Sequence, residues 1–213
     1  MRDVHVLNTI PVVFPEREIL FRLKFNIHKT ELDERQRERF KSIMMKAFAL
    51  CNPTGAWLEL PLLLNDGSRV VFEGGYEIKS HSIAELLRNC DSAFFMGVTV
   101  GGAVSALANE YINAGDGALA LIADAVGSET AEAAIDWLNS YLAGYARRKG
   151  KVLTSQRFSA GYGDFLLENQ RLFYEILDLQ NFWVSLTDTF IFVPEKTVTA
   201  IVGAANTSSM EGK

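Results

Sequence analysis

Hydrophobic residues recur along much of the chain at the three- and four-residue spacing that indicates amphipathic helices. Phe40, Ile43 and Ala47 lie on one such stripe, and the charged residues around them lie largely off it. This spacing, together with capping residues and glycine stops, predicts helices at 32–50, 81–89, 103–113, 119–149 and 166–179. Gly127 is expected to kink or split the helix at 119–149, because glycine weakens a helix interior.

Shorter apolar stretches bounded by turn residues predict the strands, which lie at 57–64, 69–72, 94–100, 184–186, 190–193 and 198–202. Pro11 and Pro15 interrupt residues 10–29, and 151–164 is predicted to be a loop. Helices and strands come in blocks rather than in strict alternation, which favours an α+β fold with a central antiparallel or mixed sheet flanked by helices. We expect a single domain at 1–205 and a disordered tail at 206–213.

Composition narrows the possible functions. The chain has 213 residues, with 21 Lys and Arg against 26 Asp and Glu, so its formal net charge is -5. This mild acidity argues against binding nucleic acid through bulk charge. Cys51 and Cys90 are widely spaced, which argues against a disulfide framework or a thiolate metal site. The first residues lack a signal-peptide pattern, and the apolar run at 93–108 falls short of the ~20 residues of a membrane span. We therefore expect a soluble, cytoplasmic protein with no membrane partner.

Familiar catalytic motifs are missing from the sequence. No HExxH metal motif, GxSxG nucleophile motif or GxxxxGK[ST] phosphate loop occurs. Gly161-Tyr162-Gly163 lacks the third glycine of a dinucleotide loop and does not follow a predicted strand. We expect no metal site, no catalytic residue and no self-contained catalytic constellation in this chain.

The most unusual local sequence is Arg157-Phe-Ser-Ala-Gly161-Tyr162-Gly163-Asp164. Its glycines allow a close backbone approach or a positive φ, and Arg157 offers a planar fork for a carboxylate or phosphate. Asp164 is placed to cap the helix that follows. The alternative is a tight interhelical loop in which Arg157 is simply a solvated or paired charge.

This loop and its surroundings resemble the reactivation (activation) domain of cobalamin-dependent methionine synthase, over 118–204. The matching elements occur in order: a helix containing Glu132, the loop from Arg157 to Tyr162, the helix at 166–179, and the segment Leu186-Thr-Asp-Thr-Phe190 leading to Pro194-Glu-Lys-Thr-Val-Thr-Ala200. The Gly161-Tyr-Gly-Asp164 form is similar to stand-alone members of that family.

The resemblance implies an α+β fold with a central antiparallel sheet and a site for S-adenosylmethionine. In that family the domain serves reductive methylation, in which flavodoxin or a ferredoxin reduces inactive cob(II)alamin and the S-adenosylmethionine methyl group traps the reduced cobalt. The cobalamin itself is expected to be held by the partner protein. In agreement, Asp3-Val-His5-Val-Leu-Asn8 lacks the glycine of the motif that ligates cobalamin through histidine.

The resemblance also implies a set of S-adenosylmethionine-binding residues. They are Glu132, Arg157, Ser159, Ala160, Gly161 and Tyr162. Arg157 would pair with the ligand's carboxylate, Glu132 would help to hold its polar end, and Tyr162 would lie near the corrin. The competing interpretation of Glu132 is an exposed helix carboxylate.

Departures from the family pattern leave alternatives open. The loop lacks the family's extra prolines, no tyrosine follows Tyr174, and the first ~110 residues do not match. The leading hypothesis is a separate reactivation subunit for a methionine synthase that lacks its own such domain. The alternatives are an accessory protein that docks on a corrinoid methyltransferase but has lost S-adenosylmethionine binding, and an acyl-CoA-dependent acyltransferase. The cations at 147–151 either help to dock an acidic partner or simply end a helix.

Overall fold

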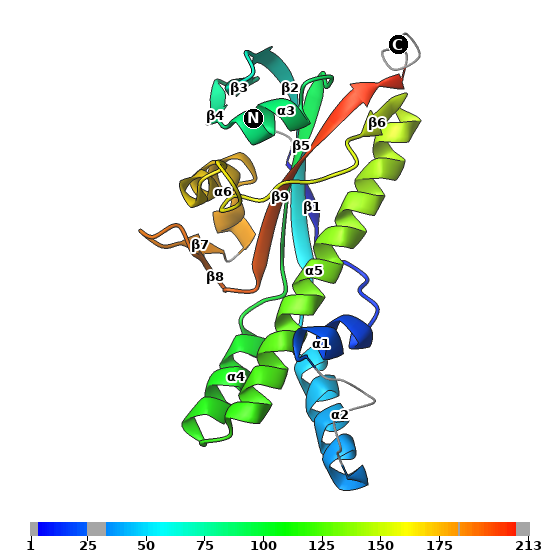
Figure 1. Cartoon of the computed structure of the whole chain (residues 1–213), viewed down its shortest axis with the longest axis vertical. Coiled ribbons are helices and arrows are strands. Elements are labelled where there is room, and N and C mark those ends of the chain that lie inside the picture. Colours follow the sequence, from blue (N-terminus) through cyan, green and yellow to red (C-terminus); the bar gives the residue numbers. More distant parts are fainter. Residues whose placement is uncertain (1–3, 25–32, 183, 208–213) are drawn as a thin grey trace.

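Three long strands form the centre of a curled antiparallel sheet (Figure 1). The computed structural model describes residues 4–24, 33–182 and 184–207. In it, β2 (Thr54–Asn65) pairs with β5 (Ser92–Thr99), which pairs in turn with β9 (Thr197–Asn206). Shorter strands extend this sheet, namely β1 (His5–Leu7), β3 (Arg69–Phe72), β4 (Tyr76–Lys79) and β6 (Lys151–Leu153). β7 (Ser185–Leu186) and β8 (Phe192–Val193) form a separate two-stranded ladder. The predicted α+β fold with a central antiparallel sheet is confirmed.

Strand β5 is buried along its whole length, which explains its continuous apolar sequence. Phe94 and Met96 pack on the side of the long helix α5 (Gly117–Arg148). Phe95 packs on the opposite side, in the cluster that includes α3 (His81–Leu86) and α6 (Gln170–Ile176). The period-two alternation of a strand thus gives the sheet two separate cores, and both must be covered by helices.

The first half of α5 projects beyond the sheet and carries a helical lobe (Figure 1). Helices α1 (Glu16–Arg22), α2 (Glu34–Ala49) and α4 (Ala103–Asn113) contribute to a third hydrophobic cluster around it. Gly127 does not break α5, contrary to the prediction. A Cβ at this position would lie 2.9 Å from Cγ1 of Val104, so glycine permits the close approach of α4. Packing, rather than helix propensity, accounts for this glycine.

Several short elements differ from the predictions. The prediction missed β1, β4 and α1, and the predicted loop at 151–164 begins with β6. The helix expected at 166–179 is divided into η1 (Leu167–Asn169), α6 and η2 (Leu179–Phe182). Phe190, expected to start a strand, has a φ of 62° and precedes β8. The start of the helix expected at 32 lies outside the described residues, and α2 begins after Asp33, which accepts a 2.7 Å hydrogen bond from the backbone N–H of Gln36.

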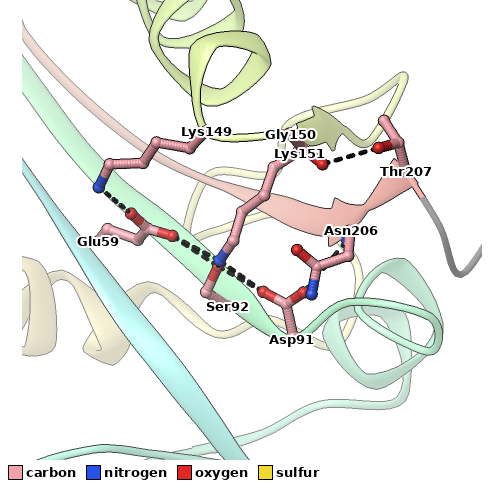
Figure 2. Close-up of polar contacts among 8 residues, drawn as sticks. All are labelled: Glu59, Asp91, Ser92, Lys149, Gly150, Lys151, Asn206 and Thr207. Atoms are coloured by element: carbon pink, nitrogen blue, oxygen red, sulfur yellow. Dashed lines mark hydrogen bonds and ion pairs between the residues drawn. The ribbon is translucent and has the colours of Figure 1, made fainter.

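An ionic network ties the strands together at the end of the sheet where β6 meets β9 (Figure 2). The Lys151 ammonium lies 2.8 Å from Oε1 of Glu59 and 2.6 Å from Oδ1 of Asp91. It also donates to Oγ of Ser92 at 2.7 Å. Lys149 reaches the other oxygen of Glu59 at 3.3 Å. Two of the cations at 147–151 are therefore engaged within the chain, which weakens the hypothesis that this cluster docks an acidic partner.

The same network fixes part of the predicted tail. The backbone N–H of Asn206 donates to Oδ2 of Asp91 at 3.1 Å, and the hydroxyl of Thr207 donates to the carbonyl of Gly150 at 2.9 Å (Figure 2). Asn206 is the last residue of β9. The expected tail at 206–213 therefore begins at least two residues too early, and 208–213 lie outside the described residues.

Candidate functional site

A pocket of about 720 Å³ opens where α5, the loop after β6, α6 and the start of β9 converge. Glu132 comes from α5 and Gln170 from α6. The loop contributes 155–160 and Tyr162, and β9 contributes 197–199. The wall thus combines a few charged groups and several hydroxyl and amide groups with an apolar surface of similar extent, as expected for a site that orients a small ligand.

Backbone hydrogen bonds hold the loop against β9. Phe158 and Ile201 exchange both of their backbone hydrogen bonds, at 2.9 and 2.8 Å. The N–H of Gly161 donates to the carbonyl of Phe165 at 2.7 Å, and Gly161 has a φ of 100°. A side chain at this position would be strained, so the predicted role of Gly161 in shaping the loop agrees with its backbone conformation. The loop is consequently a fixed wall of the pocket.

Asp164 caps a different helix from the one predicted. Its Oδ1 accepts from the hydroxyl of Ser80 at 2.8 Å, and its Oδ2 accepts from the backbone N–H of His81 at 2.5 Å. These groups lie at the N-terminus of α3, which is far away in sequence. Hydrogen bonds from the hydroxyls of Ser82 and Ser80 and from the backbone N–H groups hold the pKa of Asp164 well below its usual range. The carboxylate therefore joins the pocket loop to α3.

Arg157 is bound by two carboxylates on successive turns of α5. Its Nη2 lies 3.2 Å from Oε2 of Glu132, and its Nη1 contacts Oδ1 of Asp136. The Arg157 side chain is 25% exposed, compared with 45% for Glu132 and 64% for Asp136. One cation between two carboxylates gives this cluster, at the edge of the pocket, a net charge of about -1 at neutral pH. It can therefore receive a group that carries both a carboxylate and an ammonium.

The inner wall of the pocket carries a fixed amide. The Thr199 hydroxyl donates to Oε1 of Gln170 at 2.6 Å, and both residues line the pocket. Because the carbonyl oxygen is engaged in this way, the amide nitrogen of Gln170 remains a donor for a ligand. Nearby, Lys196 anchors the start of β9 to α5 through Asp124 at 2.5 Å and Ser128 at 2.9 Å.

The structure brings most of the predicted site residues to one wall. Glu132, Arg157, Ser159, Ala160 and Tyr162 all line the pocket. Gly161 shapes the loop but does not line the pocket. Tyr162 does line the pocket, and it is 70% exposed. Their part in ligand binding stays a prediction. Asp136, Gln170 and Thr199 were not predicted. Only Asp136 had a sequence signal, since it follows Glu132 by four residues on a predicted helix.

No group of His, Cys, Asp and Glu side chains among the described residues is arranged to hold a metal ion. No helix among them is long and apolar enough to cross a membrane. His5 stacks on Trp57 with ring centroids 4.0 Å apart, which gives this histidine a packing role.

Comparison with solved structures identifies the fold. The chain is similar to the crystal structure of the MetH reactivation domain bound to AdoHcy, with a TM-score of 0.66 and 15% sequence identity. The similarity covers 95% of this chain and 78% of that chain. No protein-family model and no curated protein sequence matches. At this identity the similarity establishes the fold alone. Because the structural similarity covers 95% of the chain, it includes most of the first ~110 residues, for which the sequence shows no resemblance to the family.

Proposed function

We propose that this chain binds S-adenosylmethionine in the pocket and presents its methyl group to the cobalamin of a separate methionine synthase that lacks its own reactivation domain. The observation that carries the proposal is the convergence of Arg157, Glu132 and the loop around Ala160 on one pocket. The neighbour in fold was solved with AdoHcy, the molecule that remains when S-adenosylmethionine gives up its methyl group. The lining residues and the fold of the neighbour thus both support S-adenosylmethionine as the ligand.

The polar end of the pocket matches the amino-acid end of S-adenosylmethionine. The guanidinium of Arg157 can bind a carboxylate through two parallel N–H groups. Glu132, which contacts Arg157 at 3.2 Å, can accept hydrogen bonds from an ammonium beside it. Two carboxylates at the same place repel a pyrophosphate, which argues against the acyl-CoA alternative.

The chemical step needs positioning rather than acid–base catalysis. The ligand's sulfonium already activates its methyl group, and the partner's cobalamin, after one-electron reduction by flavodoxin or a ferredoxin, supplies the nucleophile. The residues of this chain bind the ligand, orient its methyl group and exclude water. Alignment of two reactants contributes up to ~7–11 kcal/mol in favourable cases. Tyr162, which is 70% exposed, and Leu166, which is 56% exposed, give the same loop an apolar outer surface for the partner.

Calorimetry and a reactivation assay test the proposal together. Wild-type protein should bind S-adenosylmethionine, and Arg157→Ala should weaken binding roughly 10- to 100-fold, because a charge-assisted hydrogen bond contributes about 1.5–3 kcal/mol. Arg147→Ala, an exposed change in the last turn of α5, should bind like wild type. With an inactive synthase and a reductant, wild-type protein should accelerate methyl transfer from S-adenosylmethionine. The proposal is refuted if the wild-type protein neither binds S-adenosylmethionine nor accelerates methyl transfer from it.

The accessory-protein alternative has its own supporting observation. Arg157 is already paired within the chain with Glu132 and Asp136, so its guanidinium is not free for a ligand carboxylate. A chain with this role would bind the corrinoid partner but not S-adenosylmethionine. Calorimetry with the partner, performed with and without the ligand, separates the two functions.

A further inference from the structure

Asp136 contacts the site arginine from outside the pocket. Glu132 lines the pocket and contacts Nη2 of Arg157, whereas Asp136 does not line the pocket and contacts Nη1. Nη2 is therefore the terminal nitrogen on the pocket side. Both carboxylates come from one rigid helix, α5, at positions that share a face.

The two carboxylates contact the terminal nitrogens of the planar guanidinium, and the third nitrogen, Nε, is not part of either contact. The N–H of Nε and one N–H of Nη2 point in parallel, and this pair forms one of the two bidentate faces of an arginine. Neither carboxylate uses Nε. A ligand carboxylate that binds this face from the pocket brings a second negative charge to Nη2, which favours release of Glu132 and leaves the Nη1 contact with Asp136 intact.

We propose that Asp136 is a positioning residue that holds Arg157 in place while Glu132 moves from Arg157 to the ligand's ammonium. The inference rests on the proposed function, because it assigns the amino-acid end of S-adenosylmethionine to this site. The exchange keeps every charge paired. Arg157 keeps Asp136 and gains the ligand carboxylate, and Glu132 gains the ammonium. Without Asp136, release by Glu132 would leave the long Arg157 side chain free to leave the binding orientation.

Two ligands distinguish positioning from a general effect on the fold. S-adenosylmethionine carries the amino-acid end, whereas 5′-methylthioadenosine shares its adenosine and methylthio groups but lacks that end. Asp136→Asn should weaken S-adenosylmethionine binding roughly three- to fivefold, the effect of one partly exposed ion pair. It should leave 5′-methylthioadenosine binding unchanged. Asp136→Glu should restore the wild-type affinity, and Asp136→Asn should have no further effect in an Arg157→Ala background.

The measurements are dissociation constants from calorimetry, with thermal melts to establish that each variant folds. Unchanged S-adenosylmethionine binding by Asp136→Asn overturns the inference. So does an equal loss for both ligands, which would indicate a change in the pocket as a whole, or tighter binding, which would make Asp136 a competitor of the ligand. If wild-type protein binds no S-adenosylmethionine, the proposed function fails first and the inference fails with it.

Discussion

Replacing Lys151 by methionine should lower the free energy of unfolding by about 2 kcal/mol at pH 7. The lysine side chain is 18% exposed and bridges Glu59, itself 17% exposed, and Asp91, which is 38% exposed (Figure 2). Removing the ammonium leaves the Glu59 carboxylate half-buried with fewer donors. A hydrogen bond to a charged group contributes about 1.5–3 kcal/mol, but Asp91 can be rehydrated and methionine retains the apolar stem of lysine, so the net loss stays near the lower end.

The same substitution should change the dependence of stability on pH. Burial alone would raise the pKa of Glu59, but hydrogen bonds from Lys151 and Ser92 and the charge of Lys151 outweigh it and lower this pKa below 4.5. The unfolded chain therefore binds more protons than the native one in this range. The resulting stability is present above pH 4.5 and is lost as the pH falls through the lower native pKa. Without Lys151, the decline in stability below about pH 5 should be shallower.

Urea unfolding followed by circular dichroism, at pH 7 and pH 4, measures both effects. Lys149→Met is the matched control, because Lys149 is 47% exposed and has one contact with Glu59, at 3.3 Å, besides lying over the Tyr145 ring. Lys149→Met should lower the free energy of unfolding by less than about 1 kcal/mol. The reasoning is wrong if the two variants lose equal stability, or if Lys151→Met declines toward low pH as steeply as wild type.

Three further predictions concern packing and buried groups. Gly203→Ala should lower the free energy of unfolding by about 1–3 kcal/mol in urea titrations, because its Cβ would lie 2.5 Å from Sγ of Cys90; wild-type stability would contradict this. Asp164→Asn should lower the melting temperature at pH 7 and reduce the loss of stability toward low pH, because the lowered pKa of Asp164 contributes stability only while it is ionised; melts at pH 7 and pH 3 test this. Burial, followed by the charge of Asp91, raises the pKa of Cys90 to about 11, and burial also raises that of Cys51, so a thiol reagent at pH 8 should label both cysteines quickly only in urea.

Long elements with a strong period could be predicted from the sequence, whereas short ones could not. The helix at 119–149 and the strand at 94–100 correspond to α5 and β5, because their own apolar patterns decide how they are buried. Strand β6 has only 3 residues and exists because its partner is the end of β9, which lies some fifty residues later. Its pairing is a tertiary property that no local pattern carries.

The candidate site shows the same division. Family resemblance selected Arg157 and Glu132, which are 25 residues apart, and the fold brings them into contact. Local rules assign Asp164 as a cap of the helix that directly follows it. In the structure Asp164 instead caps α3, where its partner Ser80 lies 84 residues away in sequence. The contact between Thr199 and Gln170 depends on how α6 lies on β9, so the spacing of these residues in the sequence does not predict it.

The walls of the pocket and its polar end differ in how they are held, and this determines which substitutions separate binding from folding. Paired backbone hydrogen bonds join Phe158 to Ile201, and the half-buried Lys196 joins β9 to α5, so these contacts are part of the fold. The contacts of Arg157 are ion pairs to partly exposed carboxylates, which contribute little to stability but set the charge that a ligand meets. Substitutions at the polar end should therefore change affinity at nearly constant stability, whereas substitutions of the wall should change both. Affinity and stability measured on the same variants can accordingly distinguish a ligand site from a merely structural ion pair.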